Sequence, residues 1–371
     1  MRTGTTVRAA ALGAATLMMV TACGGGEGGA DSTEDAELSL VTGVYPLEWL
    51  AGRIGGDRVA VTQLTEPGAE PHDLELTGRQ IGEVSEADIA FYVSGLQPAV
   101  DEAVGQEAAD AALDVADVVE LHPVGDDGGH DHEGEEEHAH EEEHAHEEGH
   151  SEEEGHSEEE GHSEEEGHED EHAHEEEGDE EAHAEEEGHE EGDGHDHGDL
   201  DPHFWLDVDL MAEAAHALAD RMAELDPDGA QTYEDNAEAV TAELETIGQE
   251  YDAGLAECAH REVVVGHTAF AYLTEAHGLE QIGVSGVDPD TEPSPTQIAA
   301  ITDIVSERGI TTVFTEPLMP PATAETIAAE TGAEVAVLDP LEGVTDRSPG
   351  DDYPSIMRGN LAALTTALDC G

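Results

Sequence analysis

The chain has 371 residues, with 93 Asp and Glu residues against ten Arg and no Lys, so its formal net charge at pH 7 is −83. This charge excludes nucleic acids and anionic membrane surfaces as partners, because both would be repelled, and it favours cations. The length allows two or three domains, and about 300 residues remain for sizeable cores when one long acidic tract, residues 126–199, is left out.

The N-terminus is typical of an export signal. Positive charge precedes an apolar run, residues 9–20, which is too short to span a bilayer permanently. The run ends at Val20-Thr21-Ala22-Cys23, which resembles the lipobox of bacterial lipoproteins, where the Cys becomes the lipidated first residue after cleavage. We therefore expect a signal peptide at residues 1–22, a lipid anchor on Cys23 at the outer face of the cell membrane, and a flexible tether at residues 23–37. The alternative is ordinary secretion with an unmodified thiol.

Short strands alternate with helices after the tether, and this pattern predicts a parallel sheet flanked by helices. The expected elements are a strand at 37–44, a helix that starts at 46–51, a strand at 59–64, a helix at 80–87 and a strand at 88–93. The acidic tract follows Leu121-His122-Pro123. An insertion of this length is tolerated because the entropy of closing a loop grows slowly with its length.

The tract, residues 126–199, consists almost wholly of His, Glu, Asp and Gly, and it holds sixteen of the 23 histidines and 38 of the 93 acidic residues. It has almost nothing apolar to bury, so we expect it to be disordered. The motif Gly-His-Ser-Glu-Glu-Glu starts at Gly149, Gly155 and Gly161. Neutral imidazole is a preferred ligand of Zn²⁺, which favours a metal-binding loop over the alternative of a solvated acidic linker.

A long helical pattern dominates the middle of the chain. An amphipathic helix at 210–225 ends at Asp226-Pro227-Asp228-Gly229, and apolar residues then recur at three- and four-residue steps over residues 230–257. Such a helix extends roughly 40 Å and would join two lobes rigidly. The remaining pattern predicts strands at 262–265, 281–286, 311–315 and 334–338, and helices at 270–276, 296–308, 323–331 and 353–368.

The fold class that follows is α/β, with two lobes that are each a parallel sheet flanked by helices. We place the N-terminal lobe at residues 38–229 with the tract inside it, the linking helix at 230–257 and the C-terminal lobe at 258–371. Apart from Cys23, the chain has two cysteines, Cys258 and Cys370. An even number in an exported chain suggests a disulfide, the alternative being two separate buried thiols.

Three histidines outside the tract lie at the ends of strand-like segments: His72, His203 and His267. Ligands of open parallel sheets gather at the carboxyl ends of the strands, so these positions can converge. Asp339, directly after a strand, is a fourth candidate. Three imidazoles and a carboxylate form a sensible tetrahedral Zn²⁺ set, although each histidine taken singly is more typical of a surface or capping residue.

Six local segments lie at or near these positions: EPGAEPHD at 66–73, DPHFWLD at 201–207, GHTAFAYL at 266–273, EPSP at 292–295, FTEP at 314–317 and LDPL at 338–341. In this order they resemble segments of metal-specific solute-binding lipoproteins of ABC importers, in the zinc branch. The resemblance covers about residues 38–371, and the acidic His-rich insertion is characteristic of that branch.

The resemblance implies two lobes, a connecting helix and a metal ion in the cleft between the lobes, held by His72, His203, His267 and Asp339. Glu70 or a water molecule is the alternative fourth ligand. Relatives that bind Mn²⁺ commonly carry a carboxylate where this chain has His267, and a set of three histidines favours Zn²⁺.

The function implied is that of an extracytoplasmic zinc receptor, monomeric and without catalytic activity, that delivers Zn²⁺ to an ABC permease and touches the membrane only through its lipid. One alternative is an exported zinc hydrolase, against which the absence of an H-E-x-x-H motif argues. The other is a surface adhesin or passive zinc store in which the tract is the active part.

Overall fold

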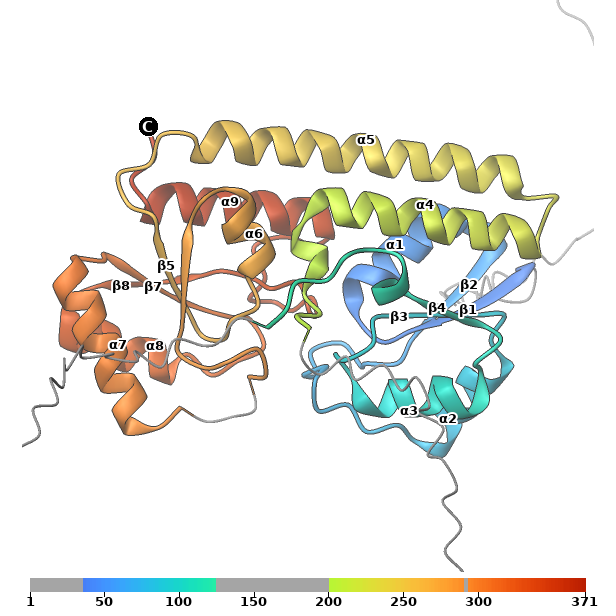
Figure 1. Ribbon diagram of the computed structural model, residues 1–371, viewed down its shortest axis with the longest axis horizontal. Coiled ribbons are helices and arrows are strands. Elements are labelled where there is room, and N and C mark those ends of the chain that lie inside the picture. Colours follow the sequence, from blue (N-terminus) through green and yellow to red (C-terminus); the bar gives the residue numbers. More distant parts are fainter. Residues whose placement is uncertain (1–35, 125–199, 290–292) are drawn as a thin grey trace, which may run out of the picture. The chain divides into compact units, whose positions relative to one another are not determined.

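Two parallel sheets organise the part of the chain that the computed structural model describes, residues 36–124, 200–289 and 293–371. The first sheet has the strand order β2-β1-β3-β4 (Figure 1). Its strands are β1 (Leu38–Thr42), β2 (Val59–Gln63), β3 (Ile89–Tyr92) and β4 (Ala112–Asp114). Around it lie α1 (Tyr45–Gly55), α2 (Gly78–Glu86), α3 (Pro98–Glu107) and the short turns η2 (Gly56–Arg58) and η3 (Val115–Asp117).

Successive side chains of a strand point to opposite faces of the sheet. Both faces of this sheet are buried, each by its own apolar cluster. Leu40 belongs to the apolar cluster that contains Leu47 and Leu50 of α1, whereas its neighbour Val41 belongs to a second cluster that contains apolar side chains of α2 and α3, such as Val84. Burial on both faces is what a parallel sheet with helices on each side requires.

The second sheet repeats this arrangement with the order β6-β5-β7-β8. Val263 and Val265 of β5 face one apolar cluster, and Val264 faces the other. The strands are β5 (Glu262–Val265), β6 (Glu280–Gly283), β7 (Thr312–Thr315) and β8 (Glu334–Val337). The helices are α6 (Ala271–Ala276), α7 (Pro295–Arg308), α8 (Ala322–Thr331) and α9 (Tyr353–Ala367).

Two long helices, α4 (Val208–Leu225) and α5 (Ala230–Leu255), lie along one another (Figure 1). The first half of α5 contacts α1, where Asn236 donates to the Ile54 carbonyl at 2.8 Å. Its second half contacts α9, where the Tyr251 hydroxyl donates to the Met357 carbonyl at 2.7 Å. The helix has 26 residues and is therefore about 40 Å long. A single straight element thus contacts both lobes.

The predicted fold class, two parallel α/β lobes, is confirmed, and a disulfide joins Cys258 to Cys370. The helix α3 and the edge strand β4 were absent from the sequence-based prediction. The predicted signal peptide, Cys23, most of the tether and the tract lie outside the described residues. Among the residues that are described, no helix combines the length and the apolar character needed to cross a membrane.

The chain on either side of the tract comes together in a short antiparallel contact. Pro123 and Leu200 form a β-bridge, and the Asp201 N–H donates to the His122 carbonyl at 2.8 Å. We call this contact, residues 122–124 and 200–201, the neck. The residues just before and just after the insertion are therefore hydrogen-bonded to each other.

Candidate metal centre

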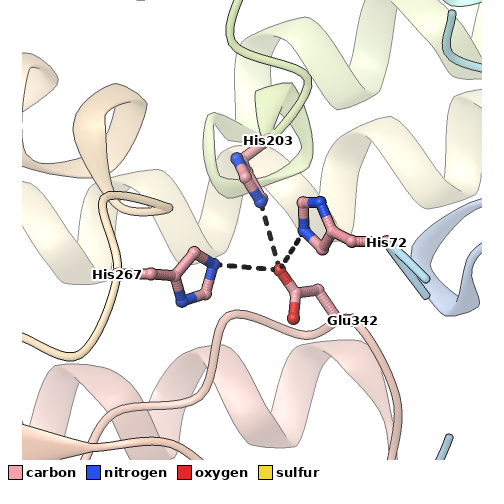
Figure 2. A group of neighbouring side chains, drawn as sticks. All are labelled: His72, His203, His267 and Glu342. Carbon is pink, nitrogen blue, oxygen red and sulfur yellow. Dashed lines mark hydrogen bonds and ion pairs between the residues drawn. The ribbon is translucent and has the colours of Figure 1, made fainter. Parts of the chain in front are cut away.

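Three imidazoles surround one carboxylate oxygen in the interior of the protein (Figure 2). Oε1 of Glu342 lies 3.3 Å from Nε2 of His72, 3.1 Å from Nε2 of His203 and 3.2 Å from Nε2 of His267. One ligand atom from each of the four residues lies within 4.8 Å of the others. In a tetrahedral zinc site with bonds of about 2.0–2.1 Å, ligand atoms are about 3.3 Å apart. The three nitrogen–oxygen distances match the edges of such a tetrahedron.

The four side chains come from the loops that follow strands or enter helices. His72 follows β2, His267 follows β5 and Glu342 follows β8, while His203 precedes the turn η5 (Phe204–Leu206). These loops lie where parallel sheets place their ligand sites, beyond the carboxyl ends of the strands. His203 and His267 have no exposed surface and Glu342 has 1%.

Carboxylates orient two of the three imidazoles. Oδ1 of Asp201 accepts the backbone N–H of His203 at 3.0 Å and its Nδ1–H at 2.7 Å. Glu316 accepts the backbone N–H of His267 at 3.0 Å and its Nδ1–H at 2.6 Å. In the neutral form of each imidazole, the proton therefore sits on Nδ1 and the lone pair of Nε2 is directed at the centre, which is how histidines that bind metals are commonly fixed.

Gly266 permits the approach of Glu316, because a Cβ at this position would lie 2.6 Å from Oε1 of Glu316. The segment that carries His203 is anchored as well. Trp205 Nε1 donates to the Pro340 carbonyl at 2.7 Å, and the Tyr353 hydroxyl donates to the Trp205 carbonyl at 2.6 Å. The Trp205 indole therefore binds the same loop that presents Glu342.

His72 is held through its backbone and its loop. Its N–H donates to Oε1 of Glu70 at 3.4 Å, and Gln97 Nε2 donates to the Pro71 carbonyl at 2.9 Å. Its side chain is 8% exposed, the most accessible of the three imidazoles. Glu70, the alternative fourth ligand, thus contacts the backbone of His72, while the carboxylate that lies among the three imidazoles, that of Glu342, comes from the other lobe.

Glu342, and not Asp339, meets the three imidazoles. Oδ1 of Asp339 accepts the Leu341 N–H at 2.8 Å, and Leu341 has a positive φ of 63°. This turn redirects the backbone, so that the side chain of Glu342, and not that of Asp339, lies among the three imidazoles. The loop after β8 thus brings Glu342 to the three imidazoles, where the sequence prediction named Asp339 of the same loop.

The charges of the centre support one another. Burial raises the pKa of Glu342, but the nearby imidazoles of His267, His203 and His72 lower it well below its usual range. Burial lowers the pKa of His267, but Glu316 and Glu342 raise it well above its ordinary value overall. The pKa of His203 is raised in the same way by Asp201 and Glu342 against the effect of burial. The carboxylates of the centre thus stabilise positive charge on the imidazoles, and the imidazoles stabilise the negative charge of Glu342.

Burial also raises the pKa of Asp339 to about 6. Oδ1 of its carboxyl group accepts the Leu341 N–H, whereas the carboxylate that is bonded to the three imidazoles is that of Glu342. Within the described residues, His72, His203, His267 and Glu342 are the one group of His, Cys, Asp and Glu side chains arranged to hold a metal ion.

Comparisons with known proteins agree with this geometry. The profile of the family ZnuA, zinc-uptake complex component A periplasmic, matches residues 40–367. The chain is 27% identical over 343 residues to the zinc-binding lipoprotein AdcA of Streptococcus pneumoniae, covering 90% of this chain and 56% of that protein. It is 28% identical over 363 residues to the high-affinity zinc uptake system protein ZnuA of Bacillus subtilis, covering 96% and 95%.

A solved structure is similar as well. The laminin-binding protein Lmb of Streptococcus agalactiae, described as a bifunctional protein with adhesin and metal-transporting activity, has 25% sequence identity and a TM-score of 0.65. The match covers 89% of this chain and 99% of that one. The chain therefore spans nearly all of Lmb and of the B. subtilis relative, but about half the length of the S. pneumoniae relative.

Proposed function

We propose a receptor function for this chain on the premise that it belongs to the family of periplasmic component A proteins of zinc-uptake complexes. The proposed function is to bind Zn²⁺ tightly outside the cytoplasm and to deliver it to the permease of an ABC importer. The names of the relatives, a zinc-binding lipoprotein and a high-affinity zinc uptake protein, support the choice of ion and of pathway.

The observation that carries the proposal is the convergence of three Nε2 atoms on one buried carboxylate oxygen. We assign the ligands as His72, His203, His267 and Glu342. Three nitrogens and one oxygen suit Zn²⁺, whereas the harder Mn²⁺ prefers more oxygen ligands. Zinc is here the cargo of the protein.

Binding without catalysis is the reading that the ligand set favours. A zinc hydrolase keeps one coordination position open for water and places a general base beside it. Here four side chains supply four ligand atoms, and the neighbouring carboxylates of Asp201 and Glu316 are each hydrogen-bonded to a ligand histidine. A hydrolytic function would need one of these groups to be released.

We also propose that Cys23 carries the lipid that keeps the protein at the outer face of the cell membrane. The support comes from the sequence of the lipobox and from the S. pneumoniae relative, which is named a lipoprotein. Cys23→Ser should move the protein from the membrane fraction to the soluble fraction and abolish incorporation of a labelled fatty acid. Labelling that persists in the variant would contradict this assignment.

The receptor proposal is tested by zinc titration in the presence of a chelator strong enough to strip the tract. Wild-type protein should retain one tightly bound zinc, and His203→Ala should lose it. His216→Ala is the matched control, because His216 lies on α4 and its Nε2 contacts Thr241 at 3.3 Å, outside the centre. Its tight zinc should be unchanged.

The same titration separates the alternatives. A passive store would lose its zinc to the chelator even in the wild-type protein. Mn²⁺ that displaces Zn²⁺ at equal concentration would contradict the choice of metal. A hydrolase would bind the ion but would keep an exchangeable water on it, which is measurable by the relaxation of solvent protons when Co²⁺ replaces zinc.

A further inference from the structure

The hydroxyl group of Tyr272 joins the two arms of the neck. Tyr272 belongs to α6 of the C-terminal lobe, and its side chain is almost fully buried. Its oxygen accepts the backbone N–H of His122 at 2.9 Å and donates to the carbonyl of Asp201 at 2.7 Å. The His122 and Tyr272 rings stack with their centroids 4.2 Å apart. One side chain thus binds the chain just before the tract and just after it.

The second arm leads directly to the metal centre. Asp201, whose carbonyl accepts the Tyr272 hydroxyl, is the residue whose carboxylate fixes the imidazole and the backbone of His203. Only one residue separates Asp201 from His203. A displacement of the neck would therefore be transmitted to the orientation of a ligand histidine within two peptide units.

The tract creates a need for such a restraint. Its 38 carboxylates repel one another, and its net charge changes with every cation it binds and with the salt concentration. The resulting forces act on the rest of the chain at the two points where the tract joins it. Both points lie at the neck, next to Asp201.

We propose that Tyr272 is a positioning residue that clamps the neck and isolates the zinc centre from the charge state of the tract. The inference rests on the proposed zinc-binding function. It assigns to the hydroxyl group a role beyond packing, because the aromatic ring alone would fill the same space. If the two sides of the neck were linked covalently, the hydrogen bonds of the hydroxyl would no longer be needed.

The test compares Tyr272→Phe with wild type in the full chain with Cys23→Ser, using zinc titration against a chelator at low salt. The variant keeps the ring and loses both hydrogen bonds of the hydroxyl. Its dissociation constant for the tight zinc should rise about tenfold, as for other losses of a group that supports a metal ligand. The difference should shrink to within about threefold at 1 M salt, where charge repulsion is screened over about 3 Å.

The decisive experiment links the two sides of the neck by a disulfide. In an antiparallel ladder, two residues that face each other without a hydrogen bond between them form a non-hydrogen-bonded pair. Their Cα atoms are about 4.5 Å apart, which is within the range for a disulfide. Pro123 and Leu200 form such a pair, since the bond between Asp201 and His122 lies just outside them. Pro123→Cys with Leu200→Cys, once oxidised, should restore the zinc affinity of Tyr272→Phe to within about threefold of wild type.

Tyr251→Phe is the matched control, because Tyr251 is also a buried tyrosine whose hydroxyl donates to one backbone carbonyl, that of Met357, away from the neck. Its tight-site affinity should not change. The inference is overturned if Tyr272→Phe binds zinc like wild type, or if the added disulfide fails to restore its affinity. A wild-type protein without a tight site would instead refute the proposed function.

A measurement on the wild-type protein covers the case in which Tyr272→Phe does not fold. The backbone N–H of His122 donates to the Tyr272 hydroxyl, so it should exchange with deuterium slowly in the zinc-loaded protein at low salt. Exchange at the rate of an unstructured peptide would show an open neck and overturn the clamp.

Discussion

The carboxylate of Glu316 holds His267 at two points, accepting its backbone N–H on Oε1 at 3.0 Å and its Nδ1–H on Oε2 at 2.6 Å. The two residues are 49 positions apart in the chain and come from the loops after β5 and β7. The two hydrogen bonds fix both the position and the tautomer of the imidazole. A histidine on a flexible loop without such a partner would have neither restraint.

Glu316→Ala should therefore weaken zinc binding by about 10- to 100-fold while leaving all four proposed ligands in place. Glu316→Gln retains an acceptor for one of the two bonds and should fall between the alanine variant and wild type. Competition titration measures both. Glu325→Ala, an exposed carboxylate in the first turn of α8, is the control, and an equal loss in that variant would remove the special role of Glu316.

The identity of the fourth ligand is tested by a pair of substitutions. Glu342→Ala removes the oxygen that the three imidazoles surround and should weaken zinc binding at least about 100-fold. Asp339→Asn keeps an acceptor for the Leu341 N–H and should stay within about tenfold of wild type, the range for a supporting group. The opposite ranking would return the ligand role to Asp339. Isothermal calorimetry and the Co²⁺ absorption spectrum report the two outcomes independently.

The sequence predicted the general plan because its strongest signals are local. The apolar residues of α5 recur at helical spacing from Tyr233 onward, and the chain breaks at Asp226–Gly229, so the helix could be located to within a few residues. In contrast, β4 has three residues at the edge of its sheet, and α3 has little apolar character beyond Val100 and Val104. Such elements are specified by their neighbours in space.

The site was predictable to the level of loops. His72, His203 and His267 follow from their motifs, and all three meet in the structure. Glu342 could not be located because Leu341 adopts a left-handed conformation, which a leucine rarely does and which its sequence does not signal. The pairing of Glu316 with His267 was equally hidden, since it joins two loops that are distant in sequence.

Zinc binding should release protons at neutral pH. In the metal-free protein, burial lowers the pKa of His203 and His267, but their carboxylate partners raise it above the ordinary value overall. Both imidazoles therefore retain protons to a higher pH, and each must lose one from Nε2 before it binds the ion. Glu342, whose pKa is lowered, is already ionised and contributes none.

The apparent zinc affinity should consequently fall as the pH falls through and below the raised pKa values of His203 and His267, and binding in that pH range should release protons. Calorimetry in two buffers with different ionisation enthalpies measures the number of released protons directly. A binding enthalpy independent of the buffer would contradict the protonation of the metal-free histidines.

Deletion of residues 126–199 should leave the zinc affinity of the metal centre within about tenfold of wild type, because all four proposed ligands lie outside the tract. The total zinc capacity should fall, and uptake should slow mainly when zinc is scarce, since the tract collects cations around the protein. Equilibrium dialysis gives the capacity and cellular uptake assays give the rate. Loss of the tight site in the deletion variant, with retention in His203→Ala, would make the tract the receptor.

Burial of the centre sets a time scale for delivery. His203 and His267 have no contact with solvent, so an ion leaves only when the segments around it separate. A site with a dissociation constant of about 1 nM that fills at about 10⁷ M⁻¹ s⁻¹ keeps its ion for roughly 100 s. For the proposed function, an importer that turns over faster than this spontaneous loss would need its permease to act on the loaded receptor and empty it. The rate of import would then depend on the docking of the receptor to the permease.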